Sequence, residues 1–189
     1  DVSRAVVVPG VSGRESDAAG AAVSGPRAGV IAGGEESVIG IAERLRALGR
    51  RTSRLRVSHA FHSPLMEPML EAFREVAEGI SYGSASVPLV SNVSGRLAVG
   101  GELASAEYWV RHVREAVRFA DGVGGLAGEG VTRFLEIGPD STLTALARTA
   151  LGDGVVCVPV QRKGRPEVDW LLAAMAAPHA RGLPCRCDG

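Results

Sequence analysis

The chain has 189 residues, enough to bury one core, and its 21 basic and 21 acidic side chains give a formal net charge of zero. This balance excludes the overall positive charge typical of proteins that bind nucleic acids or anionic membranes. No signal peptide or membrane-length apolar stretch is recognisable, and three cysteines lie at no disulfide-framework spacing. We therefore expect a cytoplasmic protein with neither a nucleic-acid nor a membrane partner.

The first 58 residues predict a small α+β unit that follows a poorly specified start. Residues 1–20 contain one apolar run, Ala5 to Val8, which is a possible strand, and three glycines interrupt the rest. Residues 21–58 then show the order strand, turn, strand, helix, strand. The expected elements are a strand at 21–23, a Gly25-Pro26 turn, a strand at 29–32, an amphipathic helix at 37–48 and a strand at 54–57.

The clearest helix signal follows two histidines, His59 and His62. Ser63 suits the N-cap position, Pro64 suits the first helical position, and Glu67 lies in the first turn, where a negative charge is favourable. Apolar residues then recur on one face at steps of three and four, at Met66, Met69, Leu70, Phe73, Val76 and Ala77. The two histidines are therefore expected just before a helix N-terminus.

Strands and helices alternate along the rest of the chain. The expected elements are a strand at 87–92, a helix capped by Ser105, a helix at 115–127, a strand at 132–137, a helix from Asp140 or Ser141 to near Gly152, a strand at 155–160 and a helix at 168–177. β-Branched strands between amphipathic helices are typical of α/β proteins. The sequence therefore predicts an α/β fold.

Five segments in the range 21–179, taken in order, resemble the malonyl-transferring acyltransferase domains of modular (type I) polyketide synthases. The resemblance extends more distantly to the malonyl-CoA:acyl carrier protein transacylases of fatty acid biosynthesis. The segments are Ala22-Val23-Ser24-Gly25-Pro26, Arg56-Val57-Ser58-His59-Ala60-Phe61-His62-Ser63-Pro64-Leu65-Met66, Val87 to Asn92, Tyr108-Trp109-Val110-Arg111-His112-Val113-Arg114 and Phe134-Leu135-Glu136-Ile137-Gly138-Pro139.

The resemblance covers the C-terminal half of such a domain and implies its fold. That fold is α/β: part of an α/β-hydrolase-like acyltransferase core with a remnant of a ferredoxin-like small subdomain. We expect the ferredoxin-like remnant at residues 21–58 and the acyltransferase core at 59–182. Residues 1–20 precede the resemblance, and 183–189 form a tail outside it.

The resemblance also implies a reaction and its partners. In such domains a serine attacks the thioester of malonyl-CoA, and the acyl-enzyme then passes the malonyl group to the phosphopantetheine thiol of an acyl carrier protein, which is a ping-pong mechanism. No bound cofactor is expected. The expected partners are that carrier protein and the neighbouring ketosynthase and linker domains of a polyketide synthase, in antibiotic biosynthesis.

By the same resemblance, four residues have expected roles. His62 is the general base, and a backbone carbonyl orients it, for which His112 is the expected source. His59 and Phe61 belong to a signature that accompanies malonyl selection, because a bulky ring beside the α-carbon would clash with a methyl branch. Such exclusion is worth about 1–3 kcal/mol, so it sets a preference.

The nucleophile of the family has no counterpart in the sequence. Neither its Gly-His-Ser-x-Gly segment nor its Gly-Gln-Gly oxyanion segment occurs, and the nearest imitation, at Ser12, lacks the preceding histidine and the second glycine. We therefore expect no nucleophile in this chain and little turnover by the chain alone. The alternative function is a non-catalytic half-domain that docks a carrier protein or complements a chain supplying the serine.

Metal and anion sites are weaker alternatives. His59 and His62 have no carboxylate or cysteine at ligand spacing, and His179 with Cys185 and Cys187 lacks a fourth ligand, so no metal is expected. The Gly138-Pro139 turn precedes a predicted helix whose N-terminal amides would suit an anion. We interpret this segment primarily as a tight turn and secondarily as part of the substrate-binding surface.

Overall fold

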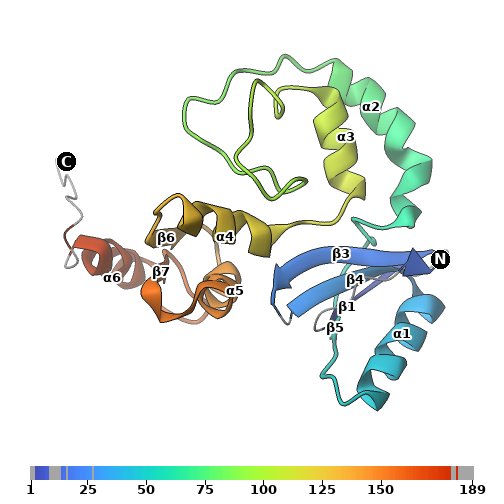
Figure 1. The fold of residues 1–189 in the computed structure, drawn as a ribbon, viewed down its shortest axis with the longest axis horizontal. Helices are drawn as coiled ribbons and strands as arrows, with labels where there is room; N and C mark the ends of the chain where they lie inside the picture. The colour runs from blue at the N-terminus through green and yellow to red at the C-terminus, as the bar shows by residue number, and fades with distance from the viewer. Residues whose placement is uncertain (1–2, 9–13, 16, 27, 180–181, 183–189) are drawn as a thin grey trace. The chain divides into compact units, whose positions relative to one another are not determined.

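The computed structural model describes residues 3–8, 14–15, 17–26, 28–179 and 182, and the chain divides into two compact units, residues 1–125 and 126–189. Each unit contains both helices and strands (Figure 1), which confirms the α/β prediction. Of the helices in these described ranges, none is long and apolar enough to cross a membrane.

The first unit contains a five-stranded antiparallel sheet with the order β2-β3-β4-β1-β5. Its strands are β1 (Ser3–Val8), β2 (Arg14–Glu15), β3 (Ala18–Gly25), β4 (Ala28–Gly34) and β5 (Ser53–Leu55). Strand β1, expected only as a possible strand, lies inside the sheet between β4 and β5. The sheet therefore combines strands from residues 1–20 with strands from residues 21–58, and β3 crosses the boundary between these two ranges.

Helix α1 (Glu35–Ala47) covers one face of this sheet (Figure 1). Its buried residues Val38, Ala42 and Leu45 form a core cluster with Ala18 of β3 and Ile31 of β4. The strands and the helix predicted for residues 21–58 are thereby confirmed. The amphipathic pattern was informative because burial on a sheet needs an apolar face of helical period.

The helix predicted after Ser63 is confirmed, but it begins as a 3₁₀ helix, η1 (Pro64–Met69), and continues as α2 (Leu70–Glu78). Pro68 lies inside η1 and has no N–H to donate, which disfavours a regular α-helical ladder there. Helix α2 packs against α3 (Ala106–Arg114), whose predicted N-cap Ser105 accepts a hydrogen bond from the Tyr108 N–H at 3.3 Å.

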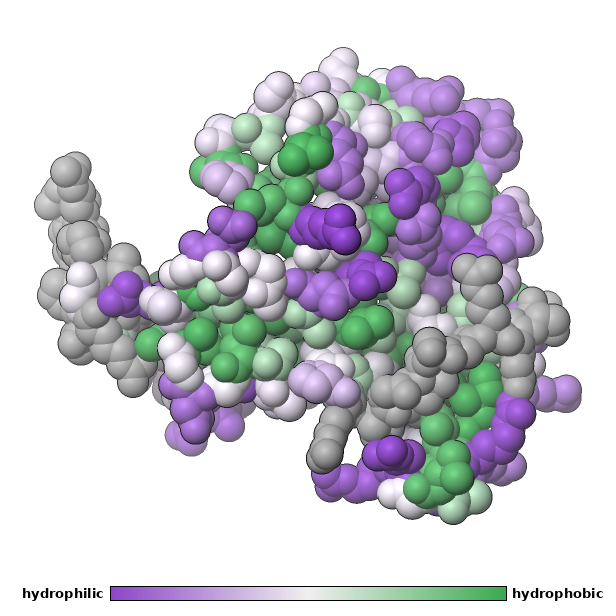
Figure 2. Space-filling view, in the orientation of Figure 1, coloured by the Kyte–Doolittle hydropathy of each residue, from purple (hydrophilic) through white to green (hydrophobic). Residues whose placement is uncertain are grey.

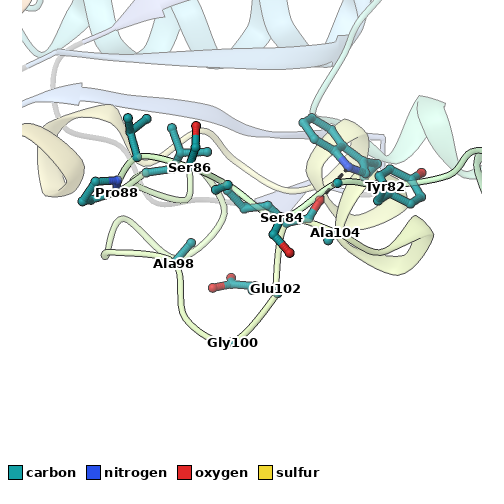
Figure 3. Close-up of a pocket in the computed structure, with 15 residues that line it drawn as sticks. Tyr82, Ser84, Ser86, Pro88, Ala98, Gly100, Glu102 and Ala104 are labelled. Carbon is teal, nitrogen blue, oxygen red and sulfur yellow. Dashed lines mark hydrogen bonds between the residues drawn. The ribbon is translucent and has the colours of Figure 1, made fainter.

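The strand predicted at 87–92 is wrong. The structure has only an isolated antiparallel bridge between Val90 and Leu97 there, and residues 87–92 belong to no named strand of the described chain. The loops before and after this bridge line an open cavity of about 730 Å³, whose wall includes Tyr82, Glu102 and Trp109 (Figure 3).

The helix predicted at 115–127 begins later than expected, as α4 (Phe119–Gly128). The residues before it are used differently: Val117 forms a parallel bridge with Ala22, with backbone hydrogen bonds to Ala21 and Val23 at 2.9 and 2.8 Å. Because these backbone groups bind the sheet, they are not available for a helical ladder.

The second unit contains the parallel strand pair β6 (Arg133–Glu136) and β7 (Val156–Pro159), joined through α5 (Thr142–Leu151) and η2 (Gly152–Gly154) and followed by α6 (Glu167–His179). Ala147 of α5, Cys157 of β7 and Ala174 of α6 are buried. This order confirms the predicted alternation of strands and helices in the C-terminal part.

Candidate active site

His62 lies on the loop between β5 and η1, next to two fully buried residues. Ala60 packs into a cluster with Ala21 and Ala32 of the sheet. The buried hydroxyl of Ser63 donates a hydrogen bond to the carbonyl oxygen of Ala60 at 2.6 Å and accepts one from the Leu65 N–H at 3.3 Å. These anchors hold the backbone on both sides of His62.

The backbone of His62 is strained. Its φ is +62°, and among the residues that the structure describes it is the one non-glycine residue with a positive φ. Such a conformation costs on the order of 1–3 kcal/mol and persists only where the surroundings impose it, which is commonest at functional sites. Its N–H donates a hydrogen bond to the carbonyl oxygen of Val113 at 3.0 Å, which helps to hold this conformation.

The His62 ring has a defined hydrogen-bond partner. Its Nδ1 lies 2.7 Å from the carbonyl oxygen of Glu115. A carbonyl oxygen can only accept, so Nδ1 carries the proton of the neutral ring. The other nitrogen, Nε2, is then unprotonated, which is the state that a general base requires.

The expectation that His112 supplies the orienting carbonyl is wrong, because Glu115 occupies that position. Helix α3 ends at Arg114, and Glu115 is extended, with φ −83° and ψ 156°. Its carbonyl therefore leaves the helical ladder and is free to accept from His62. Sequence reasoning missed Glu115 because it placed the next helix there; a backbone contact leaves no side-chain signature.

The His112 side chain nevertheless lies at the site. Its ring centroid is 5.8 Å from that of His62, and the two rings are nearly perpendicular, at 84°. Burial lowers the pKa of His112 below the ordinary histidine value, and the positive charge that His62 can carry lowers this pKa further. His112 is therefore neutral at neutral pH.

An ion pair joins the same two segments. The Arg114 guanidinium donates from Nε and Nη2 to one carboxylate oxygen of Glu67, at 2.9 and 2.8 Å. Glu67 belongs to η1, so this pair links η1 to the end of α3. The pair is partly exposed and is worth at most about 1 kcal/mol. Each residue from 112 to 115 thus contacts the segment 62–67. His112 does so through its ring, Val113 and Glu115 through their carbonyl oxygens, and Arg114 through its ion pair.

The structure also brings His59 and Phe61 together on this loop. Their ring centroids are 6.0 Å apart in an edge-on arrangement, and Phe61 is 49% exposed. The Nδ1 of His59 lies 3.0 Å from the hydroxyl oxygen of Ser58. Both side chains are accessible from solvent, and their role in selectivity stays a prediction.

Other candidate residues give no second site. Ser12, Cys185 and Cys187 lie outside the described residues, as does the side chain of His179. No cluster of three or more metal-ligating side chains occurs within the described ranges. At the N-terminus of α5, the N–H groups of Leu143 and Thr144 donate to the carboxylate of Glu136, at 3.0 and 2.7 Å. These two amide N–H groups, which an external anion would need, are therefore already hydrogen-bonded to Glu136 of the chain itself.

Comparison with known proteins gives concordant matches. The model of a family described as "Acyl transferase domain" matches residues 11–183. The polyketide synthase GfsA of Streptomyces halstedii is 52% identical over 168 residues, which cover 87% of this chain and 2% of that protein. The acyltransferase domain from the second module of the salinomycin polyketide synthase has a TM-score of 0.90 and 48% identity, over 96% of this chain and 45% of that one.

A more distant solved structure is a malonyl-transacylase in complex with its type II polyketide synthase acyl-carrier protein. It matches with a TM-score of 0.79 and 26% identity, over 93% of this chain and 59% of that one. The chain therefore spans 45% to 59% of these two solved chains, and a small part of the synthase GfsA.

Proposed function

The chain belongs to the acyl transferase domain family, of the kind found in modular polyketide synthases, and from this premise we propose that it supplies the general base for malonyl transfer. The donor is malonyl-CoA, and the acceptor is the phosphopantetheine thiol of an acyl carrier protein. The observation that carries this proposal is the hydrogen bond from Nδ1 of His62 to the Glu115 carbonyl, because it leaves Nε2 free to accept a proton.

In the first half-reaction, Nε2 of His62 takes the proton of a serine hydroxyl. The serine oxygen bonds to the thioester carbonyl carbon, the bond from that carbon to the CoA sulfur breaks, and the departing thiolate takes the proton from the imidazolium. In the second half-reaction, Nε2 takes the proton of the carrier thiol. The sulfur attacks the malonyl-serine ester, and the serine oxygen leaves and regains the proton.

The serine for this reaction has no counterpart in the sequence, which lacks Gly-His-Ser-x-Gly. We therefore assign this chain the base and not the nucleophile. A positioned general base contributes roughly 10²–10⁴-fold to such reactions. It cannot form the acyl-enzyme by itself.

Malonyl selection is assigned to Phe61, with His59 beside it. Phe61 directly precedes the base in the chain, and we propose that its exposed ring, which lies against that of His59, lines the site of the acyl group. A methyl branch on the α-carbon would meet this ring. We expect preference and not exclusion, because one methyl group changes such a selection by about 1–3 kcal/mol.

We further propose a division of the chain by family resemblance, which differs from its two compact units. We assign the antiparallel sheet with α1 to the ferredoxin-like small subdomain of the family, and residues 59–182 to its α/β-hydrolase-like core. The proposed partners are an acyl carrier protein, as in the solved malonyl-transacylase complex, and the neighbouring ketosynthase and linker domains of a synthase. The free thiol of buried Cys157 fits the reducing cytoplasm.

The test places this chain inside a complete domain. A chimera would carry residues 1–182, so that the whole antiparallel sheet comes from this chain, in place of the matching part of the salinomycin acyltransferase domain, which is 48% identical. Transfer of a malonyl group to a carrier protein is followed by mass spectrometry. We expect transfer by the chimera, and a loss of roughly 10²–10⁴-fold in His62→Ala.

The 189-residue chain by itself is the companion assay, in which we expect little or no turnover. Rapid transfer by this chain, abolished by His62→Ala, would mean that it contains its own nucleophile. Unchanged transfer by the His62→Ala chimera would remove His62 from the mechanism altogether.

A second candidate function is a non-catalytic module that complements another chain. One observation favours it: Leu135 and Ile137, in or just after β6, are 52% and 84% exposed. Parallel strands are normally covered on both faces, so this pair of strands is suited to further packing. Apolar side chains are also visible on the surface in Figure 2.

Co-expression separates the two candidates. The unmatched part of the salinomycin domain is produced together with this chain, and both co-purification and malonyl transfer are measured. Co-purification with transfer that needs His62 supports the catalytic role. Co-purification with no transfer, despite an active chimera, supports the docking role.

A further inference from the structure

The ring of His112 has no role in the transfer scheme, yet it belongs to a cluster of aromatic rings on α3. The ring centroids of Tyr108 and Trp109 lie 5.8 and 5.7 Å from that of His112, and 5.2 Å from each other. His62 is the fourth ring, and it contacts the cluster through the ring of His112. The cluster therefore leads from the helix to the proposed base.

The two rings behind His112 are themselves fixed. Tyr108 is 6% exposed, and its hydroxyl oxygen accepts a hydrogen bond from the buried hydroxyl of Ser91 at 3.2 Å. The indole N–H of Trp109 donates to the Leu103 carbonyl at 3.0 Å. Because both polar atoms have partners, these rings form a defined wall against which the His112 ring packs.

His62 needs such a wall. The ring can rotate about its Cβ–Cγ bond, and such rotation would turn Nδ1 away from the Glu115 carbonyl and change the direction of Nε2. A catalytic base must keep its nitrogen within about 2.6–3.2 Å of the proton that it takes, and a displacement of about 1 Å can cost 10²-fold in rate. A second contact with the ring removes this freedom.

We propose that the side chain of His112 is a positioning residue for His62. Its ring, nearly perpendicular to that of His62, fixes the plane of the base so that Nε2 keeps its direction. The inference rests on the proposed function of His62 as general base. It assigns the ring of residue 112 a role that is separate from any backbone contact.

The charge state of His112 agrees with this role. Burial and the neighbouring His62 lower the pKa of His112, so the positioning ring is uncharged at neutral pH. A charged neighbour would oppose the positive charge that His62 acquires when it accepts a proton. A neutral flat ring is therefore what the position requires, and phenylalanine should satisfy it where an aliphatic side chain should not.

The test is nuclear magnetic resonance of the ¹⁵N-labelled 189-residue chain, which has four histidines. The Nδ1–H of His62 should exchange slowly with water, because it is bound to the Glu115 carbonyl; its signal is assigned by its absence in His62→Gln. We expect this signal to persist in His112→Phe and to be lost in His112→Leu. His59→Leu, a change at an exposed ring on the same loop, is the matched control and should keep the signal.

Retention of the signal in His112→Leu would overturn the proposal, and so would its loss in both variants while the far-ultraviolet circular dichroism stays native. His112→Gln replaces the leucine variant if leucine prevents folding, and the same two outcomes apply. None of these signals depends on malonyl transfer. An inactive chimera with a positioned His62 would therefore count against the proposed function alone.

Discussion

The Nδ1 of His62 lies 2.7 Å from the carbonyl oxygen of Glu115, 53 positions later in the chain. This contact joins the loop before η1 to the end of α3 and determines which ring nitrogen is free. The Glu115 carbonyl is available because the residue is extended just after the helix ends. The position of the proposed base therefore depends on where α3 stops.

The Glu115 side chain should matter little, because its contact with His62 is made by the backbone. The carboxylate pairs instead with Arg111, in an exposed pair with N–O distances of 2.9 and 3.2 Å. We expect Glu115→Gln to keep malonyl transfer in the chimera close to the parent rate and to cost less than about 1 kcal/mol of stability. Arg111→Gln, which breaks the same pair, is the control. A loss of transfer of about tenfold or more in Glu115→Gln alone, about 1.4 kcal/mol, would show that the carboxylate itself is needed.

His112 should make the chain sensitive to acid. Because the pKa of His112 is lowered in the folded state, the unfolded chain takes up a proton first as the pH falls below about 6.5. Stability is therefore lost as the pH falls from about 6.5 through the lower folded-state pKa, and it is regained as the pH rises. In His112→Phe this contribution is absent. Urea denaturation at several pH values should show that the unfolding free energy of the parent chain, relative to that of His112→Phe, decreases as the pH falls below about 6.5. A difference that does not change with pH would contradict the account.

Local chemistry explains which elements the sequence could predict. Ser63 with Pro64, and Ser105, mark helix starts through contacts within a few residues, and both starts were predicted correctly. The late start of α4 and the absence of a strand at 87–92 depend on distant partners, such as the bridge between Val117 and Ala22.

The candidate site divides in the same way. Motif resemblance identified His62 and the region of α3 that faces it, because side chains carry that signal. It missed the Glu115 carbonyl and gave no indication of the His112 ring contact, which exist only once α3 has ended and packed. The strained backbone of His62 was also not predictable, because a positive φ such as +62° is uncommon for any non-glycine residue.

Ser63 should contribute more to stability than an ordinary helix cap. Its hydroxyl is fully buried and donates to the Ala60 carbonyl while it caps η1, so Ser63→Ala leaves that carbonyl without its partner. We expect a loss of about 1–3 kcal/mol. Ser105→Ala, at the half-buried cap of α3, is the matched comparison and should cost about 1 kcal/mol. Urea denaturation measures both; an equal or smaller loss in Ser63→Ala would contradict the role assigned to its burial.

Gly95 and Gly49 offer a matched pair of glycine substitutions. Both have left-handed backbones, with φ of +70° and +74°. A Cβ at Gly95 would lie 2.6 Å from the Cβ of Asp121, whereas one at Gly49 would meet nothing within 4 Å. Alanine should cost about 1–2 kcal/mol at Gly49 from backbone strain alone. At Gly95 we expect about 1–3 kcal/mol more from overpacking, measured as a lower urea midpoint. Equal costs at the two positions would show that the segment around Gly95 moves freely away from α4.

The tautomer of His62 tests the central claim most directly. Long-range ¹H–¹⁵N correlation spectra of the intact chain, recorded at a pH where the ring is neutral, distinguish a protonated from an unprotonated ring nitrogen. The account predicts a proton on Nδ1 of His62 and a chemical shift typical of an unprotonated nitrogen for Nε2. A proton on Nε2 would contradict it, because the unprotonated nitrogen would then be Nδ1, which faces the Glu115 carbonyl and cannot take the serine or thiol proton.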